Sequence, residues 1–386
     1  MAATGSAPRT IALDPPSGKG SVATQALLSA MLRADDQISQ LIFSPGRPPQ
    51  IEVSGQLVAV LAPGLEVLSA DDTRRFASDL IGQNKRAITM LQEQGSCDVS
   101  FGLPGVARFR VNVFRQRGSV GLVFRRVLPG TPSFEALGLP PVVRRLADEP
   151  RGMILVTGPT GSGKTTSIAA MIDHINESRA VNVVTIEDPI EVLHPDKKSI
   201  VNQREIGTDT EDYAQAMKRV LRQDPDVIFI GEMRDPETVW AALAAAETGH
   251  LVLSTLHTTN ATETVNRIVD FFPPFQQKQV RLTLASSLRG VVSQRLLERA
   301  DGKGRVPATE VLVMTGRIFE RIVDPENTET IEEIIAEGEY YGMQTFDQSL
   351  FNLYKNGLVS LRDAMSVASH PHDFRIALQQ AGLSTS

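Results

Sequence analysis

The sequence predicts an α/β protein with two domains, the second built on a mostly parallel sheet. Its 386 residues are 41% hydrophobic and 22% charged, a composition that can bury two cores. Residues 129–141 are rich in proline and glycine and are difficult to place inside a core, so they predict a linker. After this segment, apolar runs of strand length alternate with helical patterns, which is typical of a parallel sheet with crossover helices.

The segment before the first domain, residues 1–20, is rich in Gly, Ala, Ser and Pro and lacks periodic apolar positions. Such a composition predicts a disordered leader. The first domain is expected over residues 21–128. Helical spacing and capping signals predict helices near residues 27–32, 69–81 and 85–94. Strand patterns are found at residues 38–43, 50–53, 56–60, 97–101, 107–114 and 119–127.

One strand of the first domain has an apolar face and a cationic face. Phe109 and Val111 alternate with Arg108 and Arg110. The surrounding sequence, residues 108–126, carries six arginines and no acidic residue. This face must meet water or an anion, and a solvated face is the simpler interpretation when the segment is considered alone.

The second domain is expected over residues 142–386 and ends in a helical tail. Its strands are predicted at residues 153–157, 181–186, 227–230 and 251–254. Helix starts are predicted at Asp235, which is followed by a proline, and at Asn260, which has a glutamate three residues further on.

The sequence GPTGSGKT that follows the first of these strands fills every fixed position of the phosphate-binding loop pattern GxxxxGK[ST]. Its glycines permit positive φ and let backbone N–H groups approach phosphate oxygens. Lys164 supplies a charge to the β and γ phosphates, and the Thr165 hydroxyl can ligate Mg²⁺ at the start of a helix. A chance glycine-rich turn is the alternative, but the flanking strand and helix favour a nucleotide site. The expected nucleotide-binding residues are Gly158, Pro159, Thr160, Gly161, Ser162, Gly163, Lys164, Thr165 and Thr166.

Polar side chains follow three of the predicted strands, at the edge where ligands bind in α/β sheets. If these strands neighbour the loop strand, Glu187, Glu232 and His257 converge on the γ phosphate. In the common arrangement an aspartate directly follows the apolar strand, whereas here Gly231 occupies that position. This departure weakens the assignment of Glu232 as a direct metal ligand and favours Glu232 as the base that positions water. Glu187 is a candidate for the same role or for organising the water shell of the metal. Taken singly, such an acid is often a helix cap and such a histidine is often structural.

Charge and composition exclude several classes of protein. The net charge of −6 argues against a non-specific nucleic-acid binder, which is normally basic. A single cysteine, Cys97, excludes an internal disulfide and a cysteine-based zinc module. No apolar run approaches the roughly 18 residues that a membrane span needs, and the N-terminus lacks a signal-peptide pattern. These features predict a cytosolic protein without a nucleic-acid partner.

The motifs together resemble a known family, the secretion ATPases that drive type II secretion and type IV pili. Within that group the chain is most similar to the pilus retraction ATPases of the PilT family. The similarity covers about residues 21–381, including GMQTFDQSL at residues 342–350. The motifs that carry it are the phosphate-binding loop, TIEDPIE (185–191), RQDPDVIFIGEMRD (222–235) and TGHLVLSTLHTTNA (248–261).

The resemblance implies a PAS-like first domain, a RecA-like second domain and a homohexameric ring that binds ATP and Mg²⁺. Arg110 and Arg125 match arginines that reach from the first domain to the nucleotide and stabilise transition-state charge, as an arginine finger does. His250, in the histidine motif, is expected among the nucleotide-binding residues. The ring would act at the cytoplasmic face of the inner membrane on a platform protein, removing pilin subunits from the fibre base and so driving twitching motility.

Three alternatives stay open on the sequence. A PilU-like accessory subunit would bind nucleotide and hardly turn it over, although intact Lys164, Glu187, Glu232 and His257 favour an active enzyme. An assembly or type II secretion ATPase typically carries an additional domain and a four-cysteine metal module, for which this chain has neither the room nor the cysteines. A DNA motor is disfavoured by the acidic charge and by the lack of a basic loop with aromatic residues.

Overall fold

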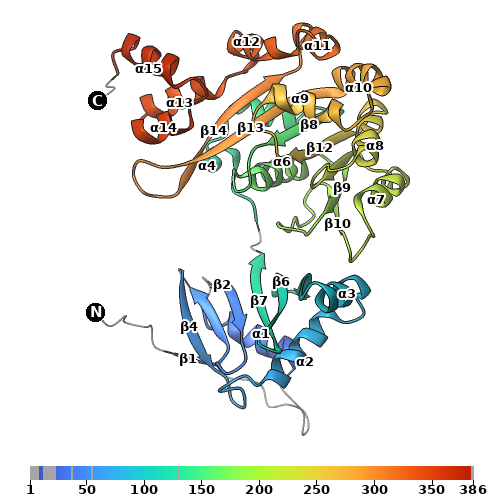
Figure 1. The fold of residues 1–386 in the computed structure, drawn as a ribbon, viewed down its shortest axis with the longest axis vertical. Coiled ribbons are helices and arrows are strands. Elements are labelled where there is room, and N and C mark those ends of the chain that lie inside the picture. The colour runs from blue at the N-terminus through green and yellow to red at the C-terminus, as the bar shows by residue number, and fades with distance from the viewer. Residues whose placement is uncertain (1–7, 12–22, 36–37, 54, 128–129, 384–386) are drawn as a thin grey trace. The chain divides into compact units, whose positions relative to one another are not determined.

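The computed structural model describes residues 8–11, 23–35, 38–53, 55–127 and 130–383. The chain forms two compact units, Met1–Pro129 (unit 1) and Gly130–Ser386 (unit 2), each with its own sheet (Figure 1). The prediction of an α/β protein is confirmed.

Unit 1 contains, within its described residues, a seven-stranded sheet in the order β1-β4-β3-β2-β7-β6-β5. All neighbouring strands are antiparallel except β1 and β4. The strands are β1 (Arg9–Thr10), β2 (Ile38–Phe43), β3 (Gln50–Val53), β4 (Gln56–Leu61), β5 (Ser96–Leu103), β6 (Ala107–Gln116) and β7 (Ser119–Val127). The helices are α1 (Thr24–Leu32), α2 (Ala70–Ile81) and α3 (Lys85–Glu93).

The core of unit 1 follows from the alternation in β6. Phe109 and Val111 are fully buried and join residues of α1 and α2, such as Leu28 and Phe76, in one apolar cluster. The predicted start of α2 is confirmed, because Ser69 forms a reciprocal capping box with the third residue of the helix. Arg108 and Arg110, which alternate with these residues, consequently lie on the opposite face of the sheet.

The prediction of a disordered leader over residues 1–20 is wrong for its described part. Arg9 and Thr10 form β1, which pairs in parallel with the end of β4, and Ile11 is buried in the core of unit 1. An edge strand offers unpaired backbone groups, and β1 satisfies them on β4. Arg9 also forms an ion pair with Asp35 at 2.6 Å. The other residues of the predicted leader lie outside the described residues.

Unit 2 contains a sheet of seven strands over residues 130–383, in the order β10-β9-β11-β12-β8-β13-β14. All neighbours are parallel except β13 and β14, so the predicted parallel sheet is confirmed. The strands are β8 (Gly152–Thr157), β9 (Asn182–Glu187), β10 (Ile200–Glu205), β11 (Val227–Ile230), β12 (Leu251–Leu256), β13 (Leu288–Glu298) and β14 (Arg305–Val313). The sequence analysis had not identified β10, β13 or β14.

Helices cover both faces of this sheet (Figure 1). Alternate residues of β8 belong to two different cores, since Met153 and Leu155 pack in one and Ile154 and Val156 in the other. One face carries α4 (Phe134–Leu137), α5 (Pro141–Ala147) and α6 (Lys164–Ser178). The other carries α7 (Tyr213–Val220), α8 (Pro236–Glu247), α9 (Ala261–Asp270), α10 (Pro274–Ser287), α11 (Gly316–Val323) and α12 (Ile331–Ala336).

The predicted helical tail is present as α13 (Phe346–Lys355), α14 (Leu361–Val367) and α15 (Pro371–Gln380). These helices share a separate apolar cluster with β13 and β14 residues such as Leu297 and Val306. Among the described residues, no helix combines the length and the hydropathy needed to cross a membrane.

The prediction that residues 129–141 form a linker is wrong for most of that segment. Unit 2 begins at Gly130, and Phe134 and Leu139 are buried in one of its cores. Ser133 caps α4, and Pro141 is the first residue of α5. Proline at a helix start costs no hydrogen bond, so these prolines delimit two short packed helices and do not indicate an open linker.

Candidate functional site

The phosphate-binding loop joins β8 to α6, as the sequence predicts. Gly158 has φ +142°, and a Cβ there would collide with the Gln294 carbonyl oxygen and lie 2.6 Å from Ser162 Oγ. Gly163, with φ +92°, is the N-cap of α6. Both positions therefore require glycine. The loop backbone and the positive end of α6 form the kind of site that binds a phosphate group.

Lys164 folds over this loop. Its Nζ donates to the carbonyl oxygens of Gly158 at 2.8 Å and Pro159 at 3.0 Å, and only 8% of the residue is exposed. Burial lowers the pKa of Lys164, while the carboxylates of Glu232 and Glu191 oppose this effect. The ammonium group of Lys164 therefore interacts electrostatically with carboxylates that follow β11 and β9.

Residues of β13 support the loop from behind, a role that the sequence analysis missed. Gln294 Nε2 donates to Ser167 Oγ in α6 at 2.8 Å, and Thr157 Oγ1 donates to Ser293 Oγ at 2.8 Å. The signal was the polar pair Ser293-Gln294 inside the apolar run of β13. Polar groups in a buried strand need hydrogen-bond partners, so such a pair marks a place where another polar segment packs.

The strand register brings Glu232 and His257 to the edge of the sheet that holds the loop. β12 lies between β11 and β8, and Leu256 is level with Thr157, the last residue before the loop. His257 Nε2 lies 3.3 Å from Glu232 Oε1, and Arg234 Nη2 lies 2.6 Å from Glu232 Oε2. Two residues predicted from separate strand ends are therefore in contact.

Glu187 ends β9, next to β11 in the sheet, and so lies at the same edge. Only 7% of the residue is exposed. Thr185 Oγ1 donates to its Oε1 at 2.6 Å, and Gln203 Nε2 donates to the same oxygen at 3.1 Å. Burial raises the pKa of Glu187 to about 7, although these two hydrogen bonds lower it. A carboxyl group in this state exchanges protons near neutral pH.

Tyr213, at the start of α7, also lies in this acidic region and was not identified from the sequence. Burial raises its pKa, and Asp188, Glu232 and Glu187 add to the effect. A Cβ at Gly231 would lie only 2.8 Å from Tyr213 Oη. Glycine at the position directly after β11, the departure noted in the sequence, is thus explained by the close approach of this tyrosine.

His250 does not lie at this edge of the sheet, and its role as a nucleotide-binding residue stays a prediction. It precedes β12, and its backbone oxygen accepts a hydrogen bond from Gly152 N at the beginning of β8. Its Nδ1 lies 2.9 Å from the Ala245 carbonyl oxygen. The six residues of β12 span roughly 20 Å, so His250 and His257 lie at opposite ends of the strand.

Arg110 and Arg125 lie in unit 1, directly opposite each other on β6 and β7. Arg110 is half-buried and Arg125 is exposed. Their side chains follow the cationic face that the sequence predicts, and their catalytic role stays a prediction.

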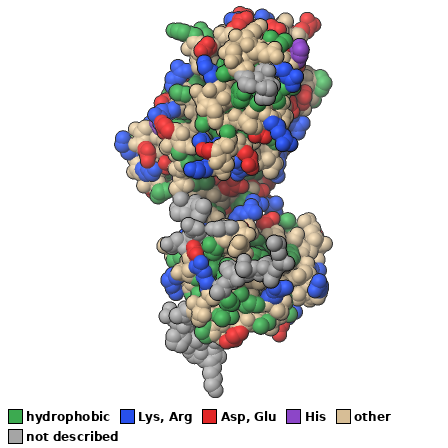
Figure 2. All heavy atoms as spheres, turned by 90° about the vertical axis from the view of Figure 1, so that its left-hand side faces the viewer, with side chains coloured by type: hydrophobic (Ala, Val, Ile, Leu, Met, Phe, Trp, Pro, Cys, Tyr) green, Lys and Arg blue, Asp and Glu red, His purple; other side chains and the backbone are tan. Residues whose placement is uncertain are grey.

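On the face of unit 2 that Figure 2 shows, basic and acidic side chains are interspersed, unlike the basic surface typical of a nucleic-acid site.

The chain is similar to a known protein family and to individual members of it. Residues 131–345 match the family model described as type II/IV secretion system protein. The chain is 46% identical over 312 residues to a twitching motility protein of Neisseria gonorrhoeae, and the aligned region covers 81% of this chain and 82% of that protein. It is 43% identical over 336 residues to the type IV pilus retraction ATPase PilT of Pseudomonas aeruginosa, covering 87% and 96%.

A solved structure supports the same relationship. The crystal structure of the pilus retraction motor PilT with bound ADP has a TM-score of 0.79 and 45% sequence identity to this chain. The match covers 90% of this chain and 98% of that one.

Proposed function

We propose, on the premise that this chain belongs to the PilT family of type IV pilus retraction ATPases, that it hydrolyses ATP to drive pilus retraction and twitching motility. The observation that carries the hydrolytic part of the proposal is the contact between Glu232 and His257 at the sheet edge that holds the phosphate-binding loop. The retraction role rests on the similarity to the retraction ATPases. A loop alone binds phosphate, whereas a carboxylate held beside it can orient water.

The residues of the loop fit ATP and Mg²⁺. Ser162 Oγ is buried and, within the described residues, has no hydrogen-bond partner, so it can meet a phosphate oxygen. Lys164 can exchange its contacts with two loop carbonyls for contacts with the β and γ phosphates. Thr165, in the first turn of α6, would be the protein ligand of Mg²⁺. When bound, Mg²⁺ neutralises charge that develops on the phosphates.

In this proposal Glu232 positions the attacking water and accepts its proton. Its two carboxylate oxygens are held separately by His257 and Arg234, which limits rotation of the carboxylate. His257 is exposed at the mouth of the site, where it can contact the γ phosphate. Glu187 supports the same step from the adjacent strand.

The arrangement of subunits extends the proposal. We place the protein in a homohexameric ring in which the first domain is PAS-like and the second RecA-like, with Arg110 and Arg125 stabilising transition-state charge. The ring acts at the cytoplasmic face of the inner membrane on a platform protein, and through it on the pilin fibre. Rotation of one domain against the other on nucleotide exchange would transmit the work.

The test is steady-state ATP hydrolysis by the purified protein, with its size measured in the same buffer. Lys164→Ala is expected to lose nucleotide binding. Glu232→Gln should bind ATP and lose roughly 100-fold or more in turnover, as removal of a general base does. Lys278→Ala, which removes an exposed lysine of α10, is the control for Lys164→Ala. Full turnover by Glu232→Gln would overturn the assignment of the base.

The role of the basic face needs its own pair of variants. Arg110→Ala should abolish turnover while the hexamer persists, and Arg115→Ala, on the other face of β6, should leave it unchanged. A wild-type ring that binds ATP, does not hydrolyse it alone and stimulates an active partner would instead identify a PilU-like accessory subunit.

A further inference from the structure

We infer that Gln203 is a positioning residue that orients the carboxylate of Glu187 and ties it to the helix that follows the phosphate-binding loop. This inference rests on the proposed function, since it concerns how Glu187 is prepared for ATP hydrolysis. Gln203 lies in β10, a strand at the edge of the sheet, sixteen residues beyond Glu187.

The amide of Gln203 makes three hydrogen bonds. Its Nε2 donates to Glu187 Oε1 at 3.1 Å and to the Val192 carbonyl oxygen at 2.8 Å, and its Oε1 accepts from His194 N at 2.9 Å. A backbone N–H can only donate, so it fixes the oxygen of the amide toward His194. The NH₂ group must therefore face Glu187.

The orientation of the Glu187 carboxylate follows. Thr185 Oγ1 and Gln203 Nε2 both donate to Oε1, so one oxygen is engaged from two sides and rotation of the carboxylate would break both bonds. The remaining oxygen, Oε2, is thereby given a fixed direction. Preorganisation of this kind is what a reacting carboxylate needs, because each misdirected orientation lowers the rate.

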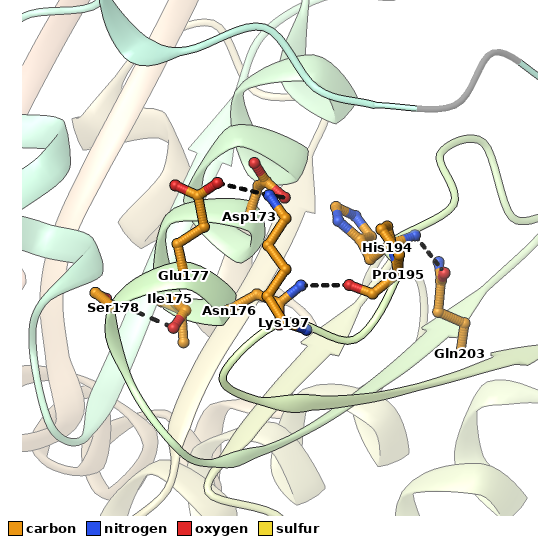
Figure 3. Close-up of polar contacts among 9 residues, drawn as sticks. All are labelled: Asp173, Ile175, Asn176, Glu177, Ser178, His194, Pro195, Lys197 and Gln203. Atoms are coloured by element: carbon orange, nitrogen blue, oxygen red, sulfur yellow. Dashed lines mark hydrogen bonds and ion pairs between the residues drawn. The ribbon is translucent and has the colours of Figure 1, made fainter.

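The segment that presents His194 to Gln203 is fastened to α6. Lys197 Nζ contacts Asp173 at 2.8 Å and Glu177 at 2.7 Å, both on α6. Figure 3 shows Lys197 extended between these two acids, with His194 and Gln203 joined on the other side of the segment.

A fully buried residue of the same helix holds the backbone of this segment. Asn176 Nδ2 donates to the Pro195 carbonyl oxygen at 2.8 Å, and Asn176 Oδ1 accepts from Lys197 N at 3.0 Å. Because α6 begins at Lys164, a continuous set of contacts joins the nucleotide-binding loop to the Glu187 carboxylate through Gln203. A shift of α6 would be felt at Glu187.

Gln203 also controls the charge of Glu187. The ionisable groups that face Glu187 are Glu191, from the segment after β9, and Tyr213, from α7. The Glu191 carboxylate favours the protonated form of Glu187, whereas Tyr213, whose own pKa is raised, is neutral and adds no charge beside it. The hydrogen bonds from Thr185 and Gln203 act in the opposite direction, since they favour the ionised form. Removal of the Gln203 donor must raise the pKa of Glu187 above about 7.

The experiment is the pH dependence of ATP turnover by the full-length wild type and Gln203→Met, a variant of similar size without the amide. If the pKa of Glu187 rises by about one unit, turnover at pH 7 falls about fivefold and recovers near pH 9. The KM for ATP should change little, because Gln203 does not touch the loop. The control is Asn202→Leu, which removes a 3.0 Å hydrogen bond between the same two strands, to Asn182, and should leave the profile unchanged.

A second variant separates orientation of the segment from donation to Glu187. Gln203→Glu keeps an acceptor for His194 N and removes the donor, so the acid limb of its profile should move at least as far as that of Gln203→Met. A uniform loss of turnover at every pH, or an unshifted limb in both variants, would overturn the inference while the ATPase function stands.

A readout that does not depend on turnover distinguishes failure of the inference from failure of the proposed function. The stability of wild type relative to Glu187→Gln should fall as pH rises, up to the folded-state pKa of Glu187 at about 7. In the Gln203→Met background this fall should continue to about pH 8. If wild type hydrolyses no ATP, the proposed function fails, and an identical end point in the two backgrounds would overturn the inference independently.

Discussion

Replacement of Glu187 by glutamine should stabilise the protein and inactivate it. Only 7% of Glu187 is exposed, and burial raises the pKa of its carboxyl group to about 7 from a reference value of 4.5. Above pH 7 the folded state must therefore hold an ionised carboxylate in a poorly solvated place. Glutamine has nearly the same shape, can still accept the hydrogen bonds from Thr185 and Gln203, and carries no charge.

The magnitude follows from the difference between the two pKa values. The raised pKa favours the protonated folded state, so stability is greatest below pH 4.5 and falls as pH rises through about 7. At pH 8 the full difference corresponds to about 3 kcal/mol, and at pH 5 to about 1 kcal/mol. For a unit of this size, 3 kcal/mol is about 6–12 °C in Tm.

The assay is thermal unfolding of wild type and Glu187→Gln at pH 5 and pH 8, together with ATP turnover. We expect a clearly larger rise in Tm at pH 8, with turnover strongly reduced at both values. Such an exchange of stability for activity is common at functional sites. An equal change in Tm at both pH values, or a lower Tm at pH 8, would refute the argument that Glu187 is an unfavourable buried charge.

Three further predictions concern packing. Gly231→Ala should lower unfolding free energy by about 1–3 kcal/mol, because its Cβ would lie 2.8 Å from Tyr213 Oη, and Tyr213→Phe should restore part of the loss in chemical denaturation. Gly158→Ala should abolish binding of a fluorescent ATP analogue, because its Cβ would collide with the Gln294 carbonyl, and retained binding would show that the loop adapts. Phe134→Ala should cost about 3–5 kcal/mol in urea unfolding, whereas a residue in an open linker would cost almost nothing.

Local patterns predicted a large part of the fold. The phosphate-binding loop, the capping box at Ser69 and the strands that precede Glu187 and Glu232 depend on residues close together in the sequence. Segments whose structure depends on distant partners were predicted less well. β1 exists because it pairs with β4, about fifty residues away, and its composition alone resembles a disordered leader.

His250 and His257 stand in one motif, but a six-residue strand places them at opposite ends of β12, so the nucleotide-binding role of His250 stays a prediction. The error about the linker has a physical reason. The segment 129–141 was predicted as a linker from its prolines, yet proline at the first turn of a helix is compatible with packing.

The sequence by itself determined which residues can bind phosphate and which carboxylates follow buried strands, because these properties reside in local backbone geometry and residue chemistry. Only the tertiary structure decided that His257 contacts Glu232, that Tyr213 lies close enough to residue 231 to require glycine there, and that Gln203 donates a hydrogen bond to Glu187. Those contacts depend on the order and register of parallel strands. Parallel neighbours need long crossover connections, so the spacing of residues along the chain does not encode which strands pair.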